Sequence, residues 1–298
     1  MIFGISGNLE KDALPQVVEQ LLERFHREKI KYVLHDALSR FIKPHLRLQK
    51  IDRSRLVAER ELGSSCDMLI SLGGDGTILR FARLLAGTNI PILGINLGKL
   101  GFLAEVSVDE LNQCLDDILR GEYTIESRMM LQSSGNGMKS AFGALNDIVV
   151  SKYGASRVMD IETYVNNEFL ATFTGDGIII STPTGSTAYA LANGGPIVAP
   201  SNKSITISPI CPHTLTARPV IVPDDSVILL KVLSSVSKIQ LTADGQLEKQ
   251  LRSPATISIK KAPFQARLVK RKSTSYYEVL RKKLHWAKDV RMRNDGSL

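Results

Sequence analysis

The segment DMLISLGGDGT, residues 67–77, decides the fold, because it joins an apolar run to a glycine-rich turn. Residues 67–72 have the length and apolar content of a buried strand, and residues 78–85 continue as a helix. In an open parallel sheet, ligands lie at the carboxyl ends of the strands. Glycines there let backbone N–H groups approach an anion, and the N-terminus of the following helix favours phosphate. The segment therefore predicts a ligand-binding turn in an α/β domain.

The carboxylate at position 75 is unexpected in a turn that only cradles phosphate, because it would repel the ligand. Asp75 must then hold a cation or take a proton. The alternative is a tight turn in which Asp75 caps the helix. The segment matches neither GxGxxG nor GxxxxGK[ST], so a Rossmann-type NAD site is not indicated.

The pattern of predicted secondary structure changes after Gly121, which predicts two domains. Residues 1–121 alternate strands and helices, which predicts a parallel sheet covered on both faces. Residues 122–274 carry successive strand-like runs separated by turn signals, which predicts a β-rich domain. We expect the helix over 275–293 to return to the first domain.

Composition excludes several classes of protein. With 298 residues, 43% hydrophobic and 23% charged, the chain is neither disordered, collagenous nor of low complexity. No apolar run approaches the roughly 18 residues of a membrane span. The start has no basic stretch and no long apolar stretch, so we expect no secretory signal. Three widely spaced cysteines predict neither a disulfide framework nor a metal site, and they fit a reducing, cytoplasmic location.

The net charge of +8 is concentrated near the C-terminus. Residues 267–293 hold ten Lys or Arg against Glu278 and Asp289, so the rest of the chain is neutral. Such a stretch can attract nucleic acid or a membrane surface. We favour the solvated face of a terminal helix, because apolar residues at roughly helical spacing, among them Tyr277, Leu280 and Trp286, lie between the charges.

Beyond the GGDGT turn, five motifs in the same order resemble the NAD kinase family, and the C-terminal stretch is also similar to that family's ending. The turn alone is shared by NAD kinases, diacylglycerol-type lipid kinases and 6-phosphofructokinases, so the other motifs decide among them. The resemblance spans roughly residue 66 to the C-terminus. The five motifs are LND at 145–147, TGDG at 174–177, TPTGSTAYALANGGP at 182–196, PICPHTLTARP at 209–219 and ADGQ at 243–246.

The resemblance implies an α/β domain of the NAD kinase, diacylglycerol kinase and phosphofructokinase type, followed by a β-rich NAD-binding domain. It implies transfer of the γ-phosphoryl of ATP to the 2′-hydroxyl of the adenosine ribose of NAD, with Asp75 as proton acceptor and NAD in the cleft between the domains. ATP, NAD and Mg²⁺ are the expected ligands, with no dedicated protein ligands for the metal. A homo-oligomer, dimer or tetramer, is expected, with no nucleic-acid or membrane partner.

The resemblance also assigns ligand-binding roles position by position. The residues expected to contact ATP or NAD are Gly74, Gly76, Leu79, Arg80, Phe102, Asn146, Asp147, Arg157, Thr174, Asp176, Thr187, Ala188, Tyr189, Ala190, Leu191, Ala192, Asp244, Gly245 and Gln246.

Ordinary structural roles remain open for many of these residues. Asn146 and Asp147 can form an Asx turn, and Asp176 and Asp244 each precede a glycine, as hairpin turns often require. The arginines can be solvated at the surface, and Leu79 can be plain core. Three rival functions also stay open: a diacylglycerol-type lipid kinase, a nucleic-acid-binding protein that uses the basic stretch, and a catalytically silent NADP sensor.

Overall fold

The computed structural model describes residues 1–44, 51–135, 138, 141–154, 158–233, 238–272 and 275–286. The chain divides into two compact units. Unit 1 comprises residues 1–78, 90–126 and 268–298, and unit 2 comprises residues 79–89 and 127–267. Residues 79–89, which follow the GGDGT turn, thus group with the β-rich part of the chain.

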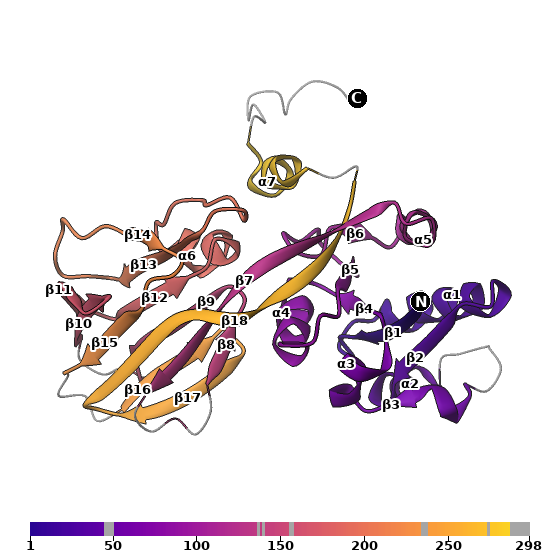
Figure 1. Cartoon of the computed structure of the whole chain (residues 1–298), viewed down its shortest axis with the longest axis horizontal. Coiled ribbons are helices and arrows are strands. Elements are labelled where there is room, and N and C mark those ends of the chain that lie inside the picture. The colour runs from indigo at the N-terminus through magenta and orange to yellow at the C-terminus, as the bar shows by residue number, and fades with distance from the viewer. Residues whose placement is uncertain are drawn as a thin grey trace, which may run out of the picture. The chain divides into compact units, whose positions relative to one another are not determined.

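Unit 1 is built on a parallel sheet in the strand order β3-β2-β1-β4-β5, with the short β6 paired to β5. In this sheet Ile5 pairs with Leu34 on one side and with Ile70 on the other. The predicted α/β domain with a parallel sheet is confirmed (Figure 1). Its strands are β1 (Ile2–Gly7), β2 (Lys31–His35), β3 (Leu56–Val57), β4 (Met68–Gly73), β5 (Ile92–Asn96) and β6 (Val106–Ser107).

The helices of unit 1 bury one face each. Helix α1 (Leu14–Arg27) buries Leu14, Val18, Leu21 and Phe25 against the apolar side chains of β1 and β2. The other elements are α2 (Asp36–Ile42), η1 (Arg53–Arg55), η2 (Glu59–Glu61), α3 (Leu62–Ser65), α5 (Leu111–Leu119) and α7 (Tyr276–Leu284).

Unit 2 contains two antiparallel layers. One is a sheet in the order β14-β13-β12-β9-β16-β17, and the other is the ladder β11-β10-β15-β18. The predicted β-rich second domain is therefore confirmed. Its strands are β8 (Phe142–Ala144), β9 (Asp147–Lys152), β10 (Met159–Val165), β11 (Glu168–Gly175), β12 (Gly177–Ser181), β13 (Ser204–Ile210), β14 (Val220–Pro223), β15 (Ile228–Val232), β16 (Lys238–Ala243) and β17 (Leu247–Arg252).

The core of unit 2 lies between these layers. Ile148, Ile178 and Ile205 from the first sheet share one buried apolar cluster with Ile161 and Leu230 from the second. Alternating burial along β15 and β16 shows that each strand gives one face to this core. Short helices, η3 (Thr184–Thr187) and α6 (Tyr189–Ala192), follow β12.

Three elements run from one unit into the other: α4 (Asp75–Leu84), β7 (Tyr123–Gly135) and β18 (Ala255–Arg271). Among the described residues, no helix has the length and apolar content that crossing a membrane requires.

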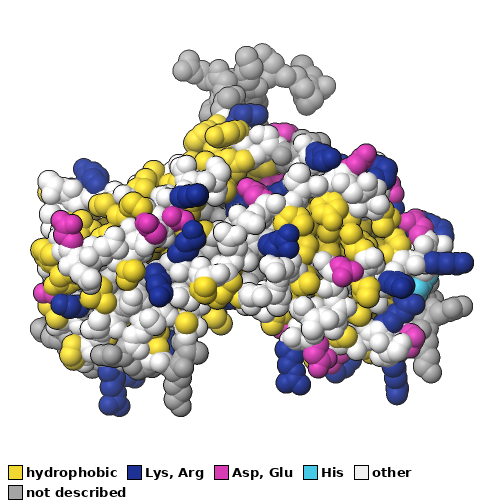
Figure 2. Space-filling view, in the orientation of Figure 1, with side chains coloured by type: hydrophobic (Ala, Val, Ile, Leu, Met, Phe, Trp, Pro, Cys, Tyr) yellow, Lys and Arg dark blue, Asp and Glu magenta, His cyan; other side chains and the backbone are white. Residues whose placement is uncertain are grey.

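Two cations of the basic C-terminal segment pair with acidic residues of unit 1. Lys270 pairs with Glu105, and Arg271 pairs with Asp117 at 3.2 Å. Helix α7 buries Val279 and Leu280, but Tyr277 on the helix and Trp286 beyond its end are exposed, so the expected apolar stripe was wrong at those two positions. On the face shown in Figure 2, Lys and Arg side chains are scattered among acidic ones. The preference for a solvated helix face over a nucleic-acid site stays a prediction.

Candidate functional site

Asp75 sits where the sequence placed it, at the junction of a buried strand and a helix. Strand β4 ends at Gly73, and α4 begins at Asp75. A Cβ at Gly73 would lie 2.2 Å from Oγ1 of Thr77, so the turn requires a glycine there. At Gly74 a Cβ would meet no atom within 4 Å, which leaves that side of the turn open.

The carboxylate of Asp75 is held by a loop, not used as a cap for its own helix. The backbone N–H of Phe102 donates to Oδ2 at 2.8 Å, and the N–H groups of Leu103 and Ala104 donate to Oδ1 at 3.0 Å each. A Cβ at Gly101 would lie 1.9 Å from Oδ1, so only glycine allows this approach. A carboxylate has about four acceptor positions. Donors from the described part of the chain fill three of them and leave one on Oδ2.

The loop that donates these amides is itself anchored. Asn96 accepts the N–H of Gly98 at 2.9 Å and donates to the carbonyl of Lys99 at 2.5 Å. Lys283 of α7 donates to the carbonyl of Leu100, and its ammonium lies 5.7 Å from the centroid of the Phe102 ring. Helix α7 therefore supports the loop that orients Asp75.

Unit 2 contains a pocket of about 350 Å³ that gathers six of the predicted binding residues. They come from the start of β9, from the α6 region and from the β16–β17 turn, which are distant in sequence. The lining residues are Asn146, Asp147, Val149, Ser151, Ala188, Tyr189, Thr242, Asp244 and Gly245. The residue Tyr189 is 46% exposed, so its ring is available to stack on a ligand.

The backbone of residues 145–147 is fixed from both sides. Asp244 accepts N–H groups from Leu145 at 3.1 Å and from Asn146 at 2.7 Å. The carbonyl of Leu145 accepts the Thr182 hydroxyl at 2.6 Å, and the carbonyl of Asn146 accepts the Thr182 N–H at 2.8 Å. A Cβ at Gly185 would lie 2.1 Å from the Asn146 carbonyl, so the TPTG turn packs directly on this segment.

Arg83 is a residue that sequence reasoning missed. Its Nη1 donates to Oδ2 of Asp244 at 2.5 Å, and its Nη2 donates to Oε1 of Gln246. The side chain of Arg83 is 11% exposed and that of Asp244 is 0% exposed. No local pattern signals a partner 161 residues away, although Arg83 shares α4 with Asp75.

Two buried carboxyl groups lie together at this pocket. Burial, with a smaller effect of the neighbouring Asp244, raises the pKa of Asp147 to about 7. Burial also raises the pKa of Asp244, and the N–H of Asn146 and the Arg83 guanidinium oppose that rise. The ion pair marks Asp244 as the charged member and Asp147 as the member that binds a proton first.

Other predicted residues lie outside the pocket lining. Asp176 pairs with Lys152 at 2.6 Å, and Thr174 donates to Oδ1 of Asp160 at 2.5 Å. Thr187 donates to the Thr184 carbonyl. Arg157 lies outside the described residues.

The remaining predicted residues have mixed exposure. Arg80 stacks on the Phe81 ring, with 4.5 Å from the guanidinium carbon to the ring centroid. Leu79 and Ala190 are buried, whereas Gly76 is exposed. Leu191 and Ala192 belong to α6.

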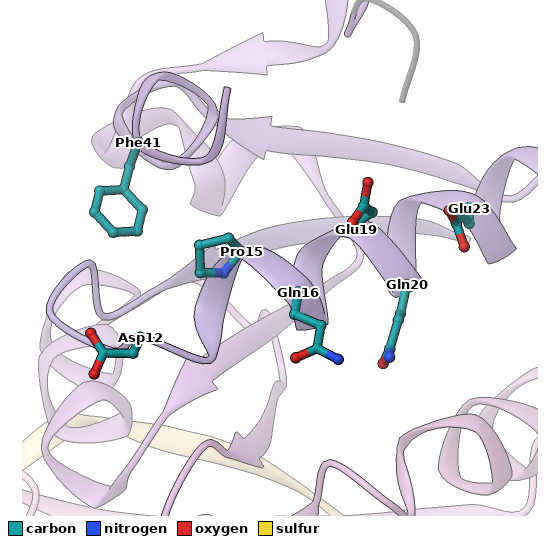
Figure 3. A pocket seen from close by; sticks show the side chains of 7 residues that line it. All are labelled: Asp12, Pro15, Gln16, Glu19, Gln20, Glu23 and Phe41. Atoms are coloured by element: carbon teal, nitrogen blue, oxygen red, sulfur yellow. The ribbon is translucent and has the colours of Figure 1, made fainter. Parts of the chain in front are cut away.

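A larger hollow of about 690 Å³ lies in unit 1, and none of the predicted site residues lines it (Figure 3). It runs along α1, and its described lining has acidic side chains and neither Lys nor Arg, which disfavours phosphate groups. Its lining is Asp12, Pro15, Gln16, Glu19, Gln20, Glu23 and Phe41. Across the described residues, no group of three or more His, Cys, Asp or Glu side chains could hold a metal ion.

Comparison with known proteins identifies the family. A model of the ATP-NAD kinase N-terminal domain matches residues 4–123, and one of the ATP-NAD kinase C-terminal domain matches residues 145–271. The NAD kinase of Geobacter metallireducens is 45% identical over 233 residues, which cover 77% of this chain and 82% of that protein.

Two solved structures share the fold. The yeast NADH kinase in complex with NADH has a TM-score of 0.88 at 25% identity, covering 99% of this chain and 90% of that one. An NAD kinase from Archaeoglobus fulgidus in complex with ATP has a TM-score of 0.74 at 26% identity, covering 96% of this chain and 99% of that one. The chain therefore belongs to the NAD kinase family of phosphate-transferring enzymes.

Proposed function

We propose that this enzyme transfers the γ-phosphoryl group of ATP to the 2′-hydroxyl of the adenosine ribose of NAD, with Asp75 as the proton acceptor. The observation that carries the proposal is the held carboxylate, which keeps one acceptor position on Oδ2. The bond from the ribose O2′ to phosphorus forms as the bond from phosphorus to the leaving ADP oxygen breaks. The hydroxyl proton passes to Oδ2, and the products are NADP and ADP.

The protein's part in this reaction is chiefly orientation. An aspartate with a reference pKa of about 3.9 cannot deprotonate an alcohol in advance. It can accept a hydrogen bond from the hydroxyl and take the proton late, when the hydroxyl has become acidic in a loose transition state. Because three backbone N–H groups already hold the Asp75 carboxylate in place, the carboxylate does not have to reorient when it takes the proton in the transition state.

We assign the binding of NAD to the pocket of unit 2. The Asn146 amide has both a donor and an acceptor and can pair with the N6 and N7 edge of adenine. Tyr189, which also lines the pocket, offers a ring to the base. A protonated Asp147 would offer a donor instead of a repelling charge to a negatively charged ligand.

Mg²⁺ is expected with the ATP donor, but the described residues do not build a cage for it. Mg²⁺ commonly keeps several waters and binds through substrate phosphates. We therefore treat it as part of the donor and route no step through a protein-bound metal.

We also propose that the chain forms a homo-oligomer. Edge strands of unit 2 expose large apolar side chains, with Phe169 of β11 at 56% and Ile221 of β14 at 50% exposure. Light scattering of the purified protein tests this, and a monomer at assay concentration would refute it.

The deciding experiment incubates the purified chain with Mg²⁺, a phosphoryl donor and a dinucleotide, and detects NADP or NADPH with enzymes specific for each. ATP and inorganic polyphosphate are compared as donors, and NAD and NADH as acceptors. We expect NADP from ATP and NAD. Binding of NADP with no product from any pair would overturn the kinase assignment in favour of a silent sensor.

A further inference from the structure

The Asp244 carboxylate cannot touch a ligand in the unit 2 pocket. The residue is 8% exposed, but its side chain is 0% exposed, so its accessible surface belongs to the backbone. Asp244 therefore contributes main chain to the pocket wall and keeps its charge behind that wall.

Every acceptor position of this carboxylate is already used inside the protein. Oδ2 accepts from Arg83 at 2.5 Å and from the Leu145 N–H at 3.1 Å. Oδ1 accepts from the N–H groups of Asn146 at 2.7 Å and Asp147 at 3.4 Å. With about four positions on a carboxylate, none is left for a substrate.

Through the Asp244 carboxylate, these contacts join two parts of the pocket wall, the β16–β17 turn and residues 145–147. Asp244 begins the turn between β16 and β17, where its φ of 53° and the φ of 62° at Gly245 are left-handed. Its own N–H returns to the Asp147 carbonyl at 3.0 Å. Arg83 holds the same turn at its far end, through Gln246. The planar guanidinium fork fits this two-point grip, which a lysine cannot reproduce.

We propose that Arg83 and Asp244 are positioning residues for the nucleotide acceptor: their buried ion pair fixes the backbone of residues 145–147 and thereby aims Asn146 and Asp147 into the pocket. Neither side chain contacts the acceptor. This inference rests on the proposed function, because it takes the pocket to hold NAD. It assigns Asp244 and Arg83 to the binding of the acceptor and not to the binding of ATP or to the phosphoryl transfer itself.

The physical consequence is specific. Removing the guanidinium leaves a buried carboxylate without its counter-charge, and such an unpaired charge is strongly unfavourable. The turn and the 145–147 segment must then shift to let water reach Asp244. A shifted Asn146 weakens acceptor binding, whereas Asp75 and its amide donors all lie in unit 1 and keep their contacts.

The test compares Arg83→Met, Arg83→Lys and Asp244→Asn with the exposed control Arg252→Met. Steady-state kinetics give KM for NAD, KM for ATP and kcat, and calorimetry gives NAD binding to the full chain without turnover. We expect Arg83→Met and Asp244→Asn to raise KM and Kd for NAD at least about tenfold with KM for ATP within twofold of wild type. Arg83→Lys should recover part of the loss.

A merely structural pair would lower thermal stability and the active fraction, hence kcat, and leave KM and Kd for NAD unchanged in the folded enzyme. That result overturns the inference. If Arg83→Met does not fold, Arg83→Lys decides, since an unchanged KM for NAD in that variant also overturns it. A wild-type enzyme that binds NAD but makes no NADP would refute the proposed function, while the binding comparison would still decide the positioning role.

Discussion

Two aspartates, one in each unit, each accept hydrogen bonds from three successive backbone N–H groups, and they differ in whether an acceptor position of the carboxylate remains unused. Asp75 accepts three successive backbone N–H groups from residues 102–104, and Asp244 accepts three from residues 145–147. Asp75 is half-buried and keeps one acceptor position on Oδ2. Asp244 has a fully buried side chain, and Arg83 takes its last position.

The difference shows that a row of backbone N–H donors orients a carboxylate, but the contacts at its fourth acceptor position determine whether it can accept a proton or only anchor the backbone. Where the fourth acceptor position is left unused by the described residues, the group can take a proton from a bound hydroxyl. Where an arginine fills that position, the group becomes a fixed anchor for the surrounding backbone. Substitutions at these aspartates and at the residues around them test this division of roles.

Asp75→Asn should nearly abolish turnover. The amide side chain keeps the shape but cannot accept the hydroxyl proton, and its NH₂ group would face amide donors. We expect kcat to fall by about 10²–10⁴-fold, the usual contribution of a positioned base, with NAD binding retained. NADP formation and NAD calorimetry measure the two effects.

The control for that variant is Asp109→Asn at an exposed position of unit 1, which should leave both quantities unchanged. Equal losses of NAD binding and of kcat in Asp75→Asn would make Asp75 a structural turn residue. Asp75 and Asp244 would then both be structural anchors, and neither would act as a base.

Gly101→Ala tests whether the row of backbone N–H groups matters for the proposed role of Asp75. Its Cβ would lie 1.9 Å from Oδ1 of Asp75, so the carboxylate or the loop must move. We expect a fall in kcat of about 10²-fold, as small misplacements of a reacting group can cause, with a much smaller change in KM for NAD. The matched control is Gly98→Ala in the same loop, where a Cβ meets nothing within 4 Å. Equal kcat values in the two variants would contradict the role of the loop.

Gly101 also marks the limit of what the sequence could predict. The parallel sheet, the β-rich second part and the position of Asp75 were predicted, because each depends on local periodicity and on a short motif. The amides of residues 102–104 could not be, since any sequence supplies backbone N–H groups. The partner of Arg83 could not be predicted either, because Asp244 lies 161 residues further along the chain and meets Arg83 only through the packing of α4 in the folded protein.

The motif resemblance went further than the residue chemistry alone. It grouped Asn146, Tyr189 and Asp244 across about a hundred positions, and the structure places all three on one pocket. It gave Asp244 a binding role without showing that its carboxylate points away from the pocket surface. Burial of a charge is a tertiary property, and the string ADGQ is equally a plain hairpin turn.

Asp147→Asn sharpens the comparison through pH. Asp147 is 4% exposed, lies beside Asp244, and has its pKa raised to about 7 by burial. A raised acid pKa means that the folded state binds more protons than the unfolded state between about pH 4 and pH 7. The stability that protonated Asp147 contributes is therefore present at low pH and lost as pH rises through about 7.

Because the asparagine side chain stays neutral at every pH, we expect the Asp147→Asn variant to gain Tm relative to wild type between about pH 5.5 and pH 8, by several degrees. Thermal melts at the two pH values measure the change, with the exposed Asp225→Asn as control. A difference in Tm that is the same at both pH values would show that Asp147 is ionised throughout.

Lys283→Met should give the smallest effect, because Lys283 contacts the loop that holds Asp75 and not Asp75 itself. Lys283 donates to the Leu100 carbonyl and lies over the Phe102 ring, in the loop that donates to Asp75. A partly exposed cation–π contact contributes about 0.5–1 kcal/mol, which corresponds to about a two- to fivefold loss of kcat if the loop loosens. Lys282→Met on the same helix, where the ammonium pairs with Glu278 one turn away, is the matched control. A loss in Lys283→Met that appears in KM for NAD instead of kcat would contradict this route, because it would connect α7 to the pocket beside Asp244 and not to Asp75.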